Sequence, residues 1–183
     1  RPPDVAIFLS KVKHQVERKL KLATGFLTSK TKNTGPDYLK EIRHRMSAFG
    51  GIIRNNTLVE KAVEEAKSEL DIIQKKISAS DVKELSDAFL LMDLSLTHYL
   101  YLEAIKTYIE SGGRSRGSFL VTDIEGYHPE GIPEDDWNFS ICRYDREIEN
   151  EILEVSYKNN SVQKELVKVK PVPDQELWFE QVW

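Results

Sequence analysis

Glycines and arginines gather at one point of the chain, in the stretch IESGGRSRGSFLV from Ile109 to Val121. A glycine-rich backbone can turn its N–H groups toward an anion, and guanidinium groups such as those of Arg114 and Arg116 bind phosphate through paired hydrogen bonds. The same composition is typical of a flexible linker. The residues alone leave three interpretations open: a phosphate-binding loop, a linker, or a corner where the chain turns between layers of a larger protein.

Other side chains capable of chemistry are dispersed. Cys142 is the only cysteine, which excludes an internal disulfide and a multi-cysteine zinc site. The histidines form no HExxH or HxxxH pair, and no GxGxxG or GxxxxGK[ST] motif is present. Adjacent carboxylates, such as Glu64–Glu65 and Asp135–Asp136, are more typical of solvated surface than of a general acid and base. The residues therefore predict no catalytic, cofactor-binding or metal site within this chain.

Charge is distributed unevenly. Residues 1–56 carry 12 Lys and Arg against 4 Asp and Glu, net +8, which leaves 14 against 26, net −12, for the remainder. The basic residues fall on polar positions of expected helices without interleaved aromatics, so a solvated face or a domain contact is favoured over nucleic-acid binding; they include Lys11, Lys13, Arg18, Lys19, Lys21, Lys40, Arg43 and Arg45. No transmembrane segment and no signal peptide are visible, and a cytoplasmic location is expected.

Apolar spacing of three and four residues predicts a series of helices. The first begins near Pro2 and Pro3, ends near Gly25, and carries a stripe of Val5, Leu9, Val12, Val16 and Leu20. The second spans 37–54, with Leu39, Ile42, Met46, Phe49 and Ile53 on one side. A capping box of Thr57 and Glu60 starts the third, whose seam is Val59, Val63, Ala66, Leu70, Ile73 and Ile77.

A fourth helix follows a cap at Ser80 or Asp81 ahead of Glu84. It carries two apolar stripes, so it needs cover on two sides and is expected at the centre. One stripe is Leu85, Phe89, Met92, Leu96 and Tyr99, and the other is Leu91, Leu94, His98, Leu102, Ile105 and Ile109. Since short loops join antiparallel neighbours, the prediction is an antiparallel three-helix bundle.

The rest of the chain changes period. WNFSICRY, EILEVSYK and KELVKVKPV alternate apolar and polar residues, which predicts strands, and KNNS suits a turn because Asn tolerates positive φ. EGYHPEGIPEDD is expected to be a loop. The predicted fold is thus mainly α: an N-terminal helix and linker at 1–36, the bundle at 37–120, and at 121–183 a loop, a β hairpin or three-stranded tail, and a short terminal helix.

Two segments in fixed order resemble a known family. EIRHRMSAFGGIIRNNTLVEKAVEEAKSEL is similar to the part of the succinate dehydrogenase/fumarate reductase flavoprotein family in which a helix ending in Gly-Ile-x-Arg-Asn precedes a capped helix. LSDAFLLMDLSLTHYLYLEAIKTYIESGGRSRGSF is similar to the family's third helix, which runs into Glu-Ser-Arg-Gly-x-His. The resemblance covers residues 37–120 and does not extend to 1–36.

This resemblance implies the C-terminal helical domain of an FAD-dependent oxidoreductase, cut from a longer chain and inactive alone. FAD and the catalytic groups would belong to the flavin-binding and capping domains of that chain, and an iron–sulfur partner subunit could place it beside a membrane. Arg54 and Asn55 match the family's Arg-Asn and would fix the turn between helices. Ser115, Arg116 and Gly117 would form a corner at the domain interface.

Departures from the family pattern leave the substrate open. The family Glu is Arg114 here and its His is Phe119, so a dicarboxylate substrate does not follow. One rival interpretation is a stand-alone helical interaction module whose basic first helix docks on a partner. Another keeps GGRSRG as an anion-binding loop with Arg114 and Arg116.

Overall fold

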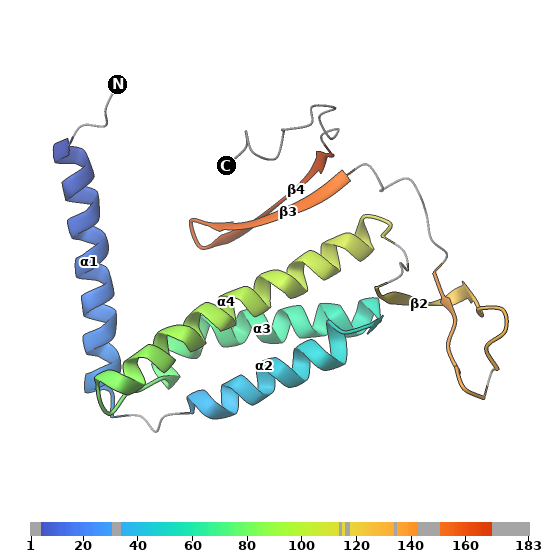
Figure 1. Cartoon of the computed structure of the whole chain (residues 1–183), viewed down its shortest axis with the longest axis horizontal. Coiled ribbons are helices and arrows are strands. Elements are labelled where there is room, and N and C mark those ends of the chain that lie inside the picture. The colour runs from blue at the N-terminus through green and yellow to red at the C-terminus, as the bar shows by residue number, and fades with distance from the viewer. Residues whose placement is uncertain are drawn as a thin grey trace, which may run out of the picture.

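A computed structural model of the chain describes residues 5–30, 34–113, 115, 118–133, 135–142 and 151–169. In this part of the chain the elements, in order, are α1 (Val5–Thr28), α2 (Gly35–Phe49), β1 (Ile53–Arg54), α3 (Asn56–Lys76), α4 (Val82–Glu110), β2 (Leu120–Tyr127), β3 (Glu151–Lys158) and β4 (Ser161–Lys168). The strands pair as β1–β2 and β3–β4 (Figure 1). The expected mainly helical fold with a β-hairpin tail is confirmed.

Helices α2, α3 and α4 lie side by side, and each contacts the other two (Figure 1). The predicted seam of α3 is buried, with Val59 and Ile73 almost fully enclosed. As expected, α4 is the central element, because it also contacts α1 and both strands of the hairpin. Apolar side chains gather in two clusters along it, one around Phe26 and Leu91 and the other around Leu102.

The helix ends correct two predictions. Helix α2 stops at Phe49 rather than at residue 54, and Ile53 and Arg54 form a strand. A side chain at Gly51 would lie 2.7 Å from the Ser47 carbonyl oxygen, so the chain leaves the helix where only glycine fits. The cap of α3 is Asn55, whose side chain accepts from the Leu58 N–H; Thr57 lies inside the helix.

The expected cap of α4 is confirmed. Asp81 accepts from the N–H groups of Lys83 and Glu84, while the Glu84 carboxylate accepts from the Ser80 N–H, which forms a reciprocal capping box. At the other end Gly112 has φ +86°, the left-handed conformation that ends many helices. The chain then turns back toward β2.

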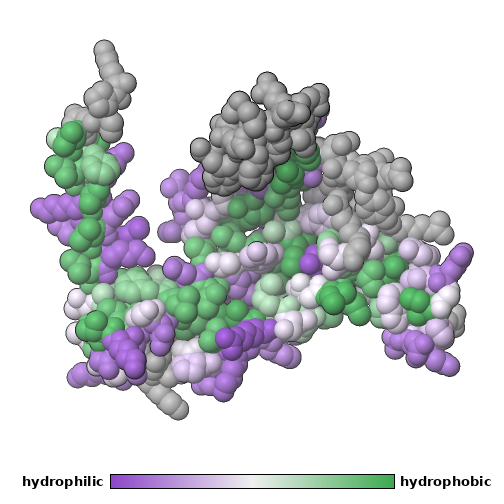
Figure 2. Space-filling model, in the orientation of Figure 1, coloured by the Kyte–Doolittle hydropathy of each residue, from purple (hydrophilic) through white to green (hydrophobic). Residues whose placement is uncertain are grey.

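Helix α1 extends away from the other elements (Figure 1). It runs to Thr28, a short way beyond the predicted end near Gly25. Only its last turns are packed: Phe26 is buried and meets Phe89 edge-on, with ring centroids 5.6 Å apart. The predicted stripe from Val5 to Leu20 is exposed, and Figure 2 shows apolar surface along this helix.

The hairpin follows the predicted alternation. Its turn, Asn159–Asn160, has φ values of 54° and 59°, as in the type I′ turns that suit twisted strands. Tyr157 and Val162 lie opposite each other and pack against the core cluster around Leu102.

The segment before the hairpin departs from expectation. Strand β2 takes in Glu125 to Tyr127, which were expected in a loop. Of the strand predicted at WNFSICRY, Ile141 makes only isolated bridges to Thr122 and Tyr127, and residues 143–150 lie outside the described part. The predicted terminal helix also lies outside it. Among the described residues, no helix has the length and apolarity needed to cross a membrane.

Candidate functional site

The two segments that carry the family resemblance meet at one corner of the structure. This corner consists of β1, the first turn of α3, Ser115 and the start of β2. Strands β1 and β2 run parallel, with Ile53 opposite Leu120 and Arg54 opposite Val121. Residues more than sixty positions apart in sequence are thereby held together, as the Asn55–Thr122 hydrogen bond shows.

Arg54 stacks on an aromatic ring within this corner. Its guanidinium carbon lies 3.9 Å from the centroid of the Phe119 ring, and its Nε donates to the Gly51 carbonyl oxygen at 3.0 Å. Phe119 in turn meets Tyr108 edge-on, with centroids 5.5 Å apart. Burial lowers the pKa of Arg54, and the nearby Tyr108 phenol acts in the opposite direction. The cation is thus stabilised by a ring face and a carbonyl, both uncharged groups.

Asn55 joins the helix start to β2. Its Oδ1 accepts from the Leu58 N–H at 3.2 Å, and its Nδ2 donates to the Thr122 hydroxyl oxygen at 3.0 Å. The Thr122 hydroxyl donates to the Arg54 carbonyl oxygen at 3.3 Å. Asn55 therefore caps α3 and ties it to the strand that follows α4.

Ser115 is buried in the same corner, and its hydroxyl is engaged within the chain. Its oxygen accepts from the Val121 N–H at 2.9 Å, which satisfies a backbone group at the start of β2. The structure therefore brings together Arg54, Asn55 and Ser115, three of the predicted interface residues. Arg116 and Gly117 lie outside the described residues, and so does Arg114, the other arginine of the suggested anion-binding loop.

A buried polar cluster between α2, α3 and α4 was missed by the sequence reading. Arg45, expected on a solvated face, is 7% exposed and forms ion pairs with Glu65 and Glu69. Burial alone would lower the pKa of Arg45, but the hydrogen bonds and charges of Glu69 and Glu65 outweigh it and raise the pKa. The sequence could have indicated this cluster through Glu65 and Glu69, which lie four residues apart on α3 and form a polar stripe beside its apolar seam.

His98 of α4 lies near the Arg45–Glu69 cluster and is buried, as expected for a core histidine. Its Nε2 is a buried atom without a hydrogen-bond partner. Burial lowers the pKa of His98 to about 4; the charge of Arg45 acts in the same direction, and that of Glu69 opposes it. The imidazole is therefore neutral at pH 7 and acts as a core side chain.

A buried acid, Glu103, connects the hairpin to α4. Glu103 accepts from the Tyr99 hydroxyl at 2.9 Å and pairs with Lys164 of β4 at 2.6 Å. Burial raises the pKa of Tyr99 to about 12, with the Glu103 hydrogen bond and charge in the same direction. These groups satisfy one another inside the chain, so they fix the hairpin's position rather than present a reactive group.

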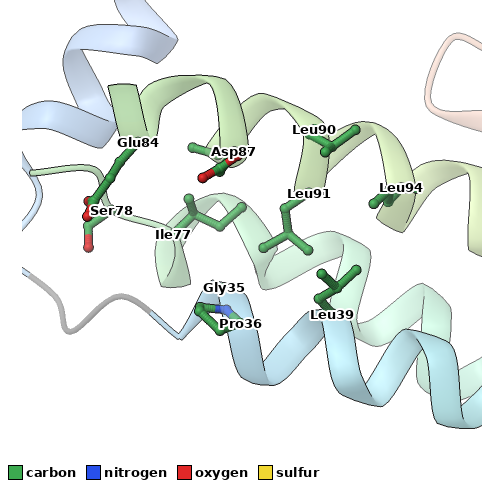
Figure 3. A pocket seen from close by; sticks show the side chains of 11 residues that line it. Gly35, Pro36, Leu39, Ile77, Ser78, Glu84, Asp87, Leu90, Leu91 and Leu94 are labelled. Atoms are coloured by element: carbon green, nitrogen blue, oxygen red, sulfur yellow. The ribbon is translucent and has the colours of Figure 1, made fainter. Parts of the chain in front are cut away.

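A groove lies between the beginnings of α2 and α4 (Figure 3). It has a volume of about 380 Å³ and is lined mainly by apolar residues, four of them leucines, with Glu84 and Asp87 as its acidic side chains. Its apolar lining suits hydrophobic side chains of a partner better than a polar substrate.

The strand-to-helix turn from β1 into α3 differs from a dinucleotide-binding cradle. A dinucleotide cradle presents free backbone N–H groups and glycines at a helix start that follows a strand. Here the strand-to-helix turn from β1 into α3 is closed by the Asn55 side chain, which occupies the Leu58 N–H. Within the described part of the chain no cluster of His, Cys, Asp and Glu could hold a metal ion.

Comparison of the chain with family models, with curated proteins and with solved structures finds no match.

Proposed function

We propose that this chain is the helical, domain-packing part of an FAD-dependent oxidoreductase that resembles the fumarate reductase and succinate dehydrogenase flavoproteins. In this proposal FAD and the catalytic groups belong to flavin-binding and capping domains of a longer cytoplasmic chain. The described helices α2, α3 and α4 represent the antiparallel three-helix bundle of that domain. The chain supplies a scaffold and contacts and does no chemistry itself.

One observation carries the proposal. The GIIRN segment after α2 and the Ser115 region after α4 are the two landmarks of the resemblance, and they meet in the corner through the β1–β2 pairing. Each contributes a group that the other requires: Asn55 bonds Thr122, and Arg54 stacks on Phe119.

The position of Phe119 supports a divergent branch of the family. The residue that replaces the family's His offers Arg54 a ring face at 3.9 Å, where an imidazole would offer a ring and a titratable nitrogen. The substrate of the proposed enzyme is therefore not assigned as a dicarboxylate. An iron–sulfur partner subunit remains part of the proposal only through the resemblance.

The gene's reading frame tests the proposal directly. A strand–GxGxxG–helix segment is expected upstream of Arg1, and the protein from the whole frame is expected to be yellow, with flavin absorbance that survives gel filtration. The chain of residues 1–183 alone is expected to be colourless and inactive. A complete frame that starts near Arg1, or a full-length protein purified without flavin after expression with added riboflavin, contradicts it.

A stand-alone helical interaction module is the second candidate. The observation that favours it is the apolar stripe of α1, which the described part of the chain leaves exposed. It explains neither the corner nor the order of the two motifs. A short reading frame whose product binds a protein partner through α1 would favour it over the flavoprotein proposal.

A further inference from the structure

Helix α1 presents an apolar face with no cover from the described chain. The α1 stripe, defined as Val5, Leu9, Val12, Val16 and Leu20, has side chains that are all at least 38% exposed. The lower half of the helix contacts α4: Phe26 is buried, and the Lys19 ammonium lies 5.4 Å from the Phe89 ring centroid. An amphipathic helix with its apolar face in water marks an interaction surface.

The charges of α1 restrict its partner. Within α1 the only acid is Glu17, against the basic residues Lys11, Lys13, Arg18, Lys19 and Lys21. Helical spacing places Lys13 and Lys19 at the two edges of the stripe. Two α1 helices packed stripe to stripe would bring like charges together, which opposes such pairing. The expected partner surface is apolar with acidic edges.

The same chain carries a surface of that description. The α2–α4 groove, about 380 Å³ in volume, is lined by Leu39, Leu90, Leu91 and Leu94, with Glu84 and Asp87 beside them (Figure 3). Leu90 is 56% exposed, so the groove is accessible from outside. Grooves of this kind bind the apolar face of an amphipathic helix.

Helix α1 does not fill the groove of its own copy. Its base is held by the Phe26–Phe89 contact and by the Ala79 N–H, which donates to the Phe26 carbonyl oxygen at 3.0 Å. From this base α1 extends away from the side of α4 on which α2 lies (Figure 1).

We propose that the α1 stripe docks into the α2–α4 groove of a second copy of this chain, and that the contact is made twice across a two-fold axis. The basic residues of α1 and the acidic Glu84 and Asp87 of the groove are opposite in charge, which favours this contact over the pairing of two α1 helices. Because the contact occurs twice, each docking needs to bury only about half of the roughly 1,600 Å² of a standard interface. This dimer is independent of the proposed flavoprotein function.

The oligomeric state of residues 1–183 and of two surface variants tests the proposal. Sedimentation equilibrium over a concentration series is expected to show a dimer that weakens as salt rises, because the contact pairs Lys with acids. The α1 variant Leu9→Glu/Val16→Glu and the groove variant Leu90→Lys each weaken dimerisation at least about tenfold, the effect of removing one buried leucine-sized side chain. Leu58→Lys, on an exposed site of α3, serves as the matched control and leaves the dimer intact.

Mixing the two variants gives the decisive readout. The α1 variant keeps an intact groove and the groove variant keeps an intact α1 stripe. A heterodimer of the two therefore has one intact contact, and the mixture should associate more tightly than either variant does alone. Unchanged circular dichroism and thermal unfolding show that both variants fold. A monomeric parent chain, a dimer that Leu90→Lys leaves intact, or no association on mixing overturns the proposal. Binding of α1 to vesicles of anionic lipid, retained by Leu90→Lys without any dimer, overturns it in favour of a membrane surface.

Discussion

Arg45 of α2 and Glu69 of α3 form a bidentate ion pair inside the helical core. Nη1 donates to Oε2 at 2.9 Å and Nη2 donates to Oε1 at 2.7 Å, while Nε donates to Glu65 at 3.1 Å. The Arg45 and Glu69 side chains are 9% and 18% exposed. Planar paired bonds of this kind fix the relative rotation of two helices as well as their distance.

We expect removal of one partner to cost far more than removal of both. Glu69→Ala leaves a buried guanidinium with only Glu65 and should lower the free energy of unfolding by about 3 kcal/mol. The double variant Arg45→Met/Glu69→Leu fills the space with apolar atoms and should lose less than about 1 kcal/mol. Urea unfolding measures both. The control Lys106→Ala breaks a partly exposed pair with Glu110 at 3.6 Å, outside this cluster, and should change stability by no more than about 0.5 kcal/mol.

Because His98 is buried with a lowered pKa, we expect the protein to lose stability in acid. Its folded-state pKa is about 4, below the usual 6.5, so between these values the unfolded chain binds a proton that the folded chain does not. The contribution of His98 to the free energy of unfolding is therefore constant above pH 6.5 and falls as the pH is lowered from 6.5 toward 4. The full effect is on the order of 3 kcal/mol.

The matched variant for this prediction is His98→Leu, which removes the titrating group and keeps an apolar side chain. The difference in unfolding free energy between parent and variant should change with pH over the range from 6.5 down to 4 and stay constant above it. Carboxylates titrate in both proteins and cancel in this difference. Parallel pH profiles for the two proteins contradict a neutral buried His98.

Apolar periodicity and turn residues predicted those elements that are encoded by neighbouring residues. The seam of α3, the central place of α4 and the Asn159–Asn160 turn follow from spacing and from residue chemistry, and the structure has them. Ile53 shows the limit: it keeps helical spacing with Phe49, yet the glycine pair before it breaks the helix. An apolar period identifies a face but not the residue at which the helix ends.

The pairing of β1 with β2 could not be predicted from the sequence. Two residues of β1 carry no alternation to detect, and their partner strand begins after the whole of α3 and α4. Arg45 was assigned to a solvated face because arginine is usually exposed. Its position, three residues after the buried Ile42, places it on the inward side of α2. The candidate corner was reached only through the resemblance, which named Arg54, Asn55 and Ser115 without their contacts.

The two bonds of Asn55 can be separated by substitution. Asn55→Ala removes both the α3 cap and the bond to Thr122, and should lower the unfolding free energy by about 1–2 kcal/mol. Asn55→Asp keeps an acceptor for the Leu58 N–H and favours the helix N-terminus, but it cannot donate to Thr122. It should retain most of the stability that Ala loses, measured by thermal unfolding. Equal losses for Ala and Asp would place the whole effect in the Thr122 bond.

The hairpin should loosen from α4 when Lys164 loses its charge. Lys164→Met leaves the Glu103 carboxylate buried, with a hydrogen bond from the Tyr99 hydroxyl at 2.9 Å but without its cation, so stability should fall by about 1–3 kcal/mol. Amide hydrogen exchange over residues 151–169 should then speed up more than exchange in α3, because the ion pair joins β4 to α4 and not α3. Lys158→Met, at an exposed site beside the hairpin turn, is the matched control and should leave exchange unchanged. A uniform rise in exchange across all elements would instead mean that Lys164 supports the whole core.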